Sequence, residues 1–142
     1  MQSGFPFNVY TTAPFAAGGD YNGDGVNTDR PNTPSFGTDL DASRDDYIAG
    51  LFTAADFPRP DVLGDLPRNA YRGPGYASTD FSFFKNFLIT DSTRVQFRFE
   101  MFNAFNRVNL RLPEGRMNQG TFGRSTESFP AREIQFGLKF IW

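Results

Sequence analysis

The last eleven residues of the chain alternate between apolar and polar side chains. Even-numbered positions from 134 to 142 carry bulky apolar groups: Ile134, Phe136, Leu138, Phe140 and Trp142. Odd-numbered positions are polar or small, with Ile141 the apolar exception: Glu133, Gln135, Gly137 and Lys139. A period of two predicts a β-strand with one apolar face. The length matches a tilted membrane-crossing strand, which needs roughly 9–11 residues.

Two further segments show the same period. Residues 94–106 place Val95, Phe97, Phe99, Met101 and Phe105 on one face, interrupted by Asn103, and Arg94, Gln96, Arg98 and Glu100 on the other. Residues 76–89 place Ala77, Thr79, Phe81, Phe83 and Phe87 opposite Ser78, Asp80, Ser82 and Asn86, with Phe84 and Lys85 as exceptions. The polar link 90–93 between these two segments predicts a hairpin turn.

The connections between the predicted strands differ greatly in length. The turn at 90–93 is tight, whereas 107–131 is long, polar and interrupted by Gly and Pro. Short periplasmic turns and long external loops are typical of outer-membrane β-barrels. We therefore expect an all-β fold, in which an antiparallel meander of three to four strands forms an arc of a transmembrane β-barrel with long external loops.

The first half of the chain has no sustained period. Residues 1–12 contain a possible fourth barrel strand, and residues 13–75, rich in Gly, Pro, Asp and Asn, predict a long external loop. Within 39–57, the helical spacing of Tyr47, Ile48, Leu51 and Phe52 indicates a short helix. The last three barrel strands are then expected within 76–142.

Composition excludes several functional classes. A net charge of −2, from 14 basic and 16 acidic residues, gives no electrostatic case for a nucleic-acid partner. Without Cys or His, the chain has no disulfide, no Cys or His metal site and no His-assisted triad. No nucleophile constellation accompanies the carboxylates, so no enzyme is predicted. The start of the chain lacks the pattern of a signal peptide, and we expect a piece of a longer protein or a chain without its leader.

Residues 20–31 resemble the opening of a calcium-binding loop. Oxygen-bearing side chains alternate along it, and Gly25 permits the sharp turn. The candidate ligands for Ca²⁺ are Asp20, Asn22, Asp24, Thr28 and Asp29. Pro31 occupies the place of the closing bidentate Glu. Two interpretations therefore stay open, a bound Ca²⁺ ion and a plain Asn/Asp/Gly turn cluster.

Arginine residues suggest two other polar sites. Residues 66–75 hold two arginines among turn-forming residues, and they either bind an anion or pair locally in a loop. Arg94, Arg98 and Glu100 either line a polar passage or form an internal charge ladder across neighbouring strands.

Four segments share their order and spacing with a known family. They are 68–87 (Arg-Asn-Ala-Tyr-Arg-Gly-Pro-Gly-Tyr-Ala-Ser-Thr-Asp-Phe-Ser-Phe-Phe-Lys-Asn-Phe), 95–107 (Val-Gln-Phe-Arg-Phe-Glu-Met-Phe-Asn-Ala-Phe-Asn-Arg), 121–124 (Thr-Phe-Gly-Arg) and 135–142. Together they resemble the C-terminus of TonB-dependent outer-membrane receptors. The nearest class is the large Oar-like receptors with an N-terminal carboxypeptidase-regulatory-like domain. Asp24-Gly25 and residues 29–32 (Asp-Arg-Pro-Asn) resemble part of an external loop in that class.

The resemblance implies energy-coupled solute uptake across the bacterial outer membrane by a barrel of about 22 strands around a plug. Only three or four strands and no plug are predicted, so the chain resembles a terminal piece that is inactive alone. The implied partners are outer-membrane lipid, the remainder of the parent barrel and plug, and the TonB system through that plug. The alternative function is a calcium-stabilised extracellular β-module with a structural or adhesive role.

The ending also resembles the signal by which the outer-membrane assembly machinery recognises a last strand. Gln135, Gly137, Phe140 and Trp142 occupy its polar, glycine, apolar and aromatic places. The same residues fit a lipid-facing strand, and the two interpretations are compatible. The resemblance adds the assembly machinery to the expected partners.

Overall fold

The computed structural model describes residues 1–11, 20–26, 28–61 and 63–142. They form two compact units. The sheet unit contains Met1, Tyr76–Asn109 and Phe129–Trp142, and the loop unit contains Gln2–Gly75 and Leu110–Ser128. Residue 12 of the possible first strand and residues 13–19 of the predicted loop lie outside the described residues. In the part that is described, no helix combines the length and apolarity needed to cross a membrane.

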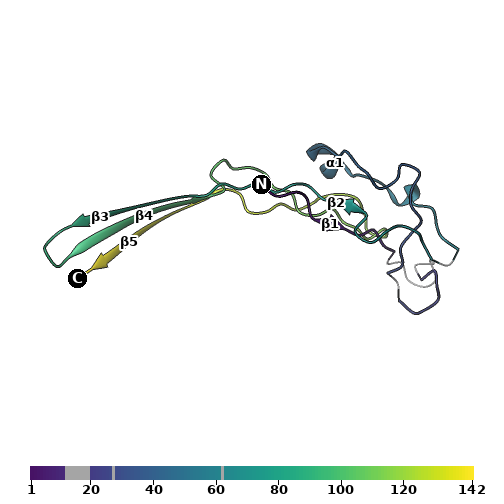
Figure 1. Cartoon of the computed structure of the whole chain (residues 1–142), viewed down its shortest axis with the longest axis horizontal. Helices are drawn as coiled ribbons and strands as arrows, with labels where there is room; N and C mark the ends of the chain where they lie inside the picture. Colours follow the sequence, from purple (N-terminus) through teal and green to yellow (C-terminus); the bar gives the residue numbers. More distant parts are fainter. Residues whose placement is uncertain (12–19, 27, 62) are drawn as a thin grey trace. The chain divides into compact units, whose positions relative to one another are not determined.

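The sheet unit contains a three-stranded antiparallel sheet (Figure 1). In it, β3 (Phe81–Leu88) pairs with β4 (Arg94–Phe102), and β4 pairs with β5 (Glu133–Ile141). Strands that follow one another in the chain are neighbours in the sheet, so the all-β meander predicted from the sequence is confirmed. The lengths of 8, 9 and 9 residues approach the roughly 9–11 residues of a tilted membrane-crossing strand.

Each strand is shorter than its predicted segment. At one end of β4, Asn103 has a φ of 47°, in the left-handed region, which takes it out of the extended pleat. The Asn103 side chain, 7% exposed, then closes the turn. Its Nδ2 donates to the carbonyl oxygens of Arg107 (3.0 Å) and Pro130 (3.3 Å). The strand predicted to reach residue 106 therefore ends at Phe102.

Before β3, the side chain of a second buried asparagine takes the place of a neighbouring strand as the hydrogen-bond partner of the backbone. Ala77 N donates to Asn109 Oδ1 (2.9 Å), and Asn109 Nδ2 donates to Ala77 O (3.0 Å), so one side-chain amide pairs with both backbone groups. Asn109 is 2% exposed. Asp80 Oδ1 in turn accepts the backbone N–H of Asn103 at 2.9 Å. These bonds satisfy backbone groups beyond the regular sheet, where buried polar groups need partners.

The two faces of the sheet carry different chemistry. The apolar face consists of four cross-strand rows: Phe81/Met101/Ile134, Phe83/Phe99/Phe136, Lys85/Phe97/Leu138 and Phe87/Val95/Phe140. The polar face consists of the rows between them: Ser82/Glu100/Gln135, Phe84/Arg98/Gly137, Asn86/Gln96/Lys139 and Leu88/Arg94/Ile141. Shifting the register by one residue would bring apolar side chains to the polar face, so this sorting specifies the pairing.

A tight turn joins β3 to β4. Ile89 N donates to Thr93 O at 2.9 Å. Thr93 N donates back to the carbonyl oxygen of Thr90 (3.3 Å) and to its hydroxyl oxygen (3.0 Å). The turn thus fixes the hairpin register at the opposite end of the sheet from Asn103.

The loop unit has a small sheet of its own. There, β1 (Pro6–Phe7) pairs antiparallel with β2 (Tyr71–Arg72). The structure therefore differs from the barrel strand expected over 1–12, because the described strand has two residues and pairs with β2, not with β3, β4 or β5. Phe7 (6% exposed) and Val9 (1% exposed) are directed into a core of the loop unit, and this core determines their pairing.

That core is largely aromatic and joins distant parts of the sequence. Phe52 lies at its centre, with ring centroids 5.1 Å from those of Phe57, Tyr71 and Phe122. The buried members are Phe7, Val9, Phe52, Phe57, Leu66, Tyr71 and Phe122. Burying one large apolar side chain stabilises a fold by about 1.5–3 kcal/mol. The sequence predicts an external loop over 13–75. The described residues of this segment instead share a hydrophobic core with 110–128.

A short helix lies within the predicted 39–57 segment. It is α1 (Arg44–Ala49), followed by the 3-10 turn η2 (Ala54–Asp56). A capping box starts α1: Asp46 N donates to Ser43 Oγ at 3.3 Å, and Ser43 N donates to Asp46 Oδ2 at 2.8 Å. Gly50, with a φ of 117°, ends it. Tyr47 is directed inward and donates its hydroxyl to Arg72 O at 3.0 Å.

Candidate functional site

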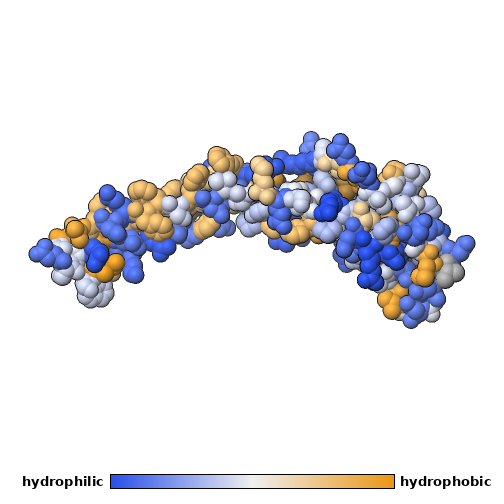
Figure 2. All heavy atoms as spheres, viewed as in Figure 1, coloured by the Kyte–Doolittle hydropathy of each residue, from blue (hydrophilic) through white to orange (hydrophobic). Residues whose placement is uncertain are grey.

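The apolar face of the sheet is open to its surroundings. The exposed fractions are 70% for Phe136, 65% for Leu138 and 62% for Phe140, and Trp142, just after β5, is 90% exposed. Figure 2 shows hydrophobic side chains at the surface over the three strands, beside hydrophilic ones. None of the described elements of the sheet unit covers these four residues. A contiguous exposed apolar surface is unfavourable in water and marks a membrane or protein contact.

Aromatic rings of neighbouring strands contact one another on this face. The ring centroid of Phe136 lies 5.3 Å from that of Phe99 and 6.2 Å from that of Phe97. Lys85 is the one cation in the four apolar rows. Its long aliphatic stem can lie along the apolar surface while the ammonium group reaches the polar boundary of a membrane.

The polar face carries an ordered arginine. Arg98 lies over the ring of Phe84, with its guanidinium carbon 5.0 Å from the ring centroid, and its Nη2 donates to Glu100 Oε1 at 3.3 Å. On the same face, Gln96 Nε2 donates to Asn86 Oδ1 at 3.0 Å. Among the described residues, Arg98 and Glu100 are thus paired with each other, but both lie in β4. This contact is not a charge ladder across neighbouring strands, and both interpretations left by the sequence stay predictions. In a closed barrel such a face would line the interior.

The four residues of the predicted assembly signal do not share one face of the sheet. Gln135 and Gly137 lie on the polar face and Phe140 lies on the apolar face, whereas Trp142 follows the last residue of β5 and is 90% exposed. A Cβ added at Gly137 would lie 3.6 Å from Arg98 Cβ, an ordinary van der Waals contact. The fold of the described sheet therefore does not require glycine at this position, and recognition by assembly machinery stays a prediction.

The carboxylates of the predicted calcium loop accept hydrogen bonds from backbone groups of the loop itself. Asp20 accepts the N–H groups of Gly23 (2.7 Å), Asp24 (3.1 Å) and Gly25 (2.9 Å). The Asp29 carboxylate accepts from the backbone of Tyr21 and Asn22. In the described part of the chain, no group of three or more His, Cys, Asp or Glu side chains could hold a metal ion. These bonds match the turn-cluster interpretation, and calcium binding by Asp20, Asn22, Asp24, Thr28 and Asp29 stays a prediction.

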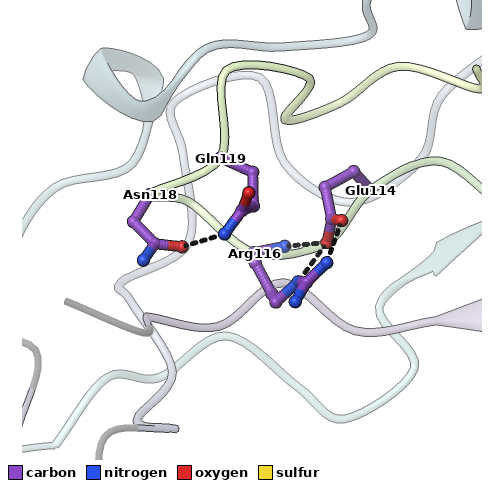
Figure 3. Close-up of polar contacts among 4 residues, drawn as sticks. All are labelled: Glu114, Arg116, Asn118 and Gln119. Carbon is purple, nitrogen blue, oxygen red and sulfur yellow. Dashed lines mark hydrogen bonds and ion pairs between the residues drawn. The ribbon is translucent and has the colours of Figure 1, made fainter.

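The loop unit also contains an ion pair that the sequence pattern does not indicate. Arg116 Nε and Nη2 donate to Glu114 Oε1 (2.9 Å) and Oε2 (2.6 Å), a two-pronged contact visible in Figure 3. Arg116 N also donates to Glu114 Oε1 at 3.0 Å. These hydrogen bonds lower the pKa of Glu114 below its usual value and raise that of Arg116. The pair orders a turn within 110–128, in the segment expected to be an irregular external loop.

The two arginines of the 66–75 segment have different environments. Arg72 Nη1 donates to Gly4 O at 3.3 Å, so this arginine is paired locally. Arg68 instead lines a pocket in the loop unit together with Arg30. The sequence pattern indicates a possible anion site at Arg68 but does not indicate that Arg30 lies beside it. Its only sequence signal was the resemblance of residues 29–32 to an external loop of known receptors.

Comparison with known proteins gives one family match. The family described as "Outer membrane beta barrel domain" matches residues 1–135 of the chain. No curated protein and no solved structure matches at the significance required. The family match does not favour the alternative of a calcium-stabilised extracellular module.

Proposed function

Because the chain belongs to the outer membrane β-barrel domain family, whose members lie in the bacterial outer membrane, we propose that it forms the C-terminal part of the barrel of a TonB-dependent receptor. The receptor takes up a solute with energy supplied through TonB. The observation that supports the proposal is that the segments of the resemblance coincide with the strands of the sheet. The segments that resemble TonB-dependent receptors, 68–87, 95–107 and 135–142, contain all of the three-stranded sheet except a few terminal residues.

The described sheet needs further strands to be stable in a membrane. One edge of β3 and one edge of β5 have no partner strand among the described residues. Unpaired backbone N–H and C=O groups cost several kcal/mol each in hydrocarbon, so membrane sheets close into barrels. Three strands cannot close a barrel, since the smallest known have about eight. The remainder of the parent barrel therefore supplies the missing strands in this proposal.

The strand lengths fit the thickness of the membrane. A strand of 9 residues, such as β4 or β5, spans about 30 Å at roughly 3.3 Å per residue. With a tilt of about 40°, it rises roughly 23 Å across the membrane, close to the apolar band of about 25 Å in such barrels. The turn at 90–93 then lies on the periplasmic side, and the predicted long loops, 13–75 and 107–131, belong to the external side, where a receptor binds its solute.

Energy coupling requires a plug that contacts TonB, and the plug fills the lumen of large barrels. The proposed partners are therefore the plug, the TonB system acting through it, the assembly machinery and outer-membrane lipid. The polar face, with Arg98 and Glu100, faces the lumen and the plug in this arrangement.

An antibody against residues 20–30 tests the proposal on outer membranes of the source bacterium. The captured protein should contain a plug by peptide mass mapping and should crosslink to TonB in living cells. In planar bilayers it should give no steady open-channel current, because a plug closes the lumen. A protein without a plug that conducts ions continuously and does not crosslink to TonB would show a porin and contradict the proposal. An antibody against an unrelated porin provides the matched control.

A further inference from the structure

A pocket of about 300 Å³ lies within the loop unit. It is lined by Asn8, Tyr10, Thr28, Arg30 and Arg68. This volume is at the lower end of the range for small-molecule sites, about 300–1,000 Å³. None of the described lining residues carries a carboxylate, whereas two carry guanidinium groups. Since the chain as a whole has a net charge of −2, this local excess of positive charge does not follow from composition.

Hydrogen bonds join the three segments that form the pocket wall. Thr11 N donates to Asp29 O at 2.9 Å, and Leu66 N donates to Pro31 O at 3.2 Å. Asn69 N donates to Asn8 Oδ1 at 2.6 Å. These bonds hold the three segments of the pocket wall together without a ligand. A preformed pocket loses less conformational freedom on binding than a flexible loop.

Three side chains of the pocket wall, those of Arg30, Arg68 and Asn8, keep N–H groups that can donate hydrogen bonds to a ligand. Arg30 uses Nη1 to donate to Leu66 O at 2.7 Å, which fixes its guanidinium group and leaves its other N–H groups. Among the described residues, no ion-pair or hydrogen-bond partner occupies Arg68. Asn8 uses its oxygen for Asn69, so its amide N–H groups remain available.

We propose that this pocket binds the oxyanion group, phosphate or carboxylate, of a small acidic solute. The planar donor fork of arginine matches the geometry of both oxyanions, and charge-assisted hydrogen bonds of this kind are the stronger ones. Arg68 and Arg30 provide the charge, and Asn8 and Thr28 add neutral polar groups. Binding at this pocket does not depend on whether the parent barrel is coupled to TonB.

The test uses the intact outer-membrane protein that contains this chain, folded in detergent micelles and labelled with ¹⁵N. Inorganic phosphate and citrate are titrated separately at constant ionic strength, with chloride as the reference anion. The Nε–Hε resonances of Arg30 and Arg68 should shift and saturate, with half-saturation on the order of 1 mM or below. Saturation by phosphate alone assigns a phosphorylated solute, and saturation by citrate alone assigns a carboxylic acid.

Two variants separate binding from folding. Arg68→Gln should weaken binding roughly tenfold or more, since a hydrogen bond to a charged group contributes at least one factor of ten. Asn8→Asp keeps the oxygen that accepts Asn69 N but replaces the amide donor by a carboxylate, so the oxyanion should be repelled. Arg59→Gln is the matched control, because Arg59 lies over the ring of Tyr21 (5.3 Å to its centroid) and does not line the pocket.

The dispersion of the backbone amide resonances shows whether each variant keeps its fold. Absence of saturation with both phosphate and citrate in the folded chain would overturn the proposal. It would also be overturned if Arg68→Gln and Arg59→Gln weakened binding equally, because the anion would then respond to overall charge and not to the pocket.

Discussion

Replacing Phe136 by arginine should destabilise the membrane-embedded barrel far more than the same change at Gln135. The two residues are neighbours in β5 but lie on opposite faces of the sheet. Phe136 is 70% exposed on the apolar face, and Gln135 lies in the polar row with Ser82 and Glu100. The pair therefore compares hydrocarbon with the barrel interior at nearly the same depth.

The depth of Phe136 follows from its place in the strand. It precedes Trp142 by six residues, or about 20 Å along a strand at roughly 3.3 Å per residue. With a tilt of about 40°, this is roughly 15 Å from the periplasmic boundary, close to the middle of the bilayer. Arginine on the lipid face at the midplane costs about 2–4 kcal/mol. The lost ring contacts with Phe97 and Phe99 add about 0.5–1.5 kcal/mol each.

We thus expect Phe136→Arg to lower the free energy of unfolding by about 3–7 kcal/mol. Gln135→Arg should change it by no more than about 1 kcal/mol. The measurement is urea unfolding of the intact outer-membrane protein that contains this chain, folded in lipid vesicles and followed by circular dichroism. Equal losses in the two variants, or a larger loss for Gln135→Arg, would refute the assignment of the apolar face to lipid.

Further predictions concern the strand end and the loop unit. Gly137→Ala should leave the stability of the folded barrel nearly unchanged, because the added Cβ would lie 3.6 Å from Arg98 Cβ, an ordinary van der Waals contact. If the amount of protein in the outer membrane then falls while the stability is unchanged, the glycine acts in assembly. Trp142→Gln should lower the amount of the protein in the outer membrane, measured by immunoblot, more than Ile141→Gln does. Ile141 is the control because the predicted assembly signal allows any residue there. Equal effects of the two changes would count against the assembly signal. Burial raises the pKa of Tyr71 from 10.0 to about 12, so the unfolded chain loses this proton first. The loop unit should keep its stability below about pH 10 and lose roughly 2–3 kcal/mol between pH 10 and 12. Near-ultraviolet circular dichroism measures this loss of stability, and Tyr71→Phe should reduce it. An identical dependence on pH in the Tyr71→Phe variant would refute the prediction.

The strands were predictable because their pattern is local. The alternation of Phe97, Phe99 and Met101 with polar neighbours identifies β4 without any knowledge of its partners, and the polar link 90–93 indicates its hairpin. The ends of the strands were less predictable. Asn103 interrupts the apolar pattern in the sequence, but only its left-handed φ and its buried hydrogen bonds show that the strand stops there.

The loop unit could not be predicted, since its core depends on contacts between distant residues. Phe7, Phe52, Tyr71 and Phe122 have no common period, and they pack together only because 110–128 folds against 2–75. The same reason explains the pocket. Arg30 and Arg68 are far apart in the sequence, and hydrogen bonds among 8–11, 29–31 and 66–69 bring them to one wall.

The central claim is that the apolar face of the sheet contacts lipid, and site-directed spin labelling tests it most directly. The chain has no native Cys, so single cysteines can be placed at successive positions from 133 to 141 in the intact protein without removing others from this segment. In lipid vesicles, labels at 134, 136, 138 and 140 should be accessible to oxygen and shielded from a water-soluble nickel reagent, with odd positions showing the opposite. Accessibility without a period of two, or even positions shielded from both reagents, would contradict a lipid-facing strand.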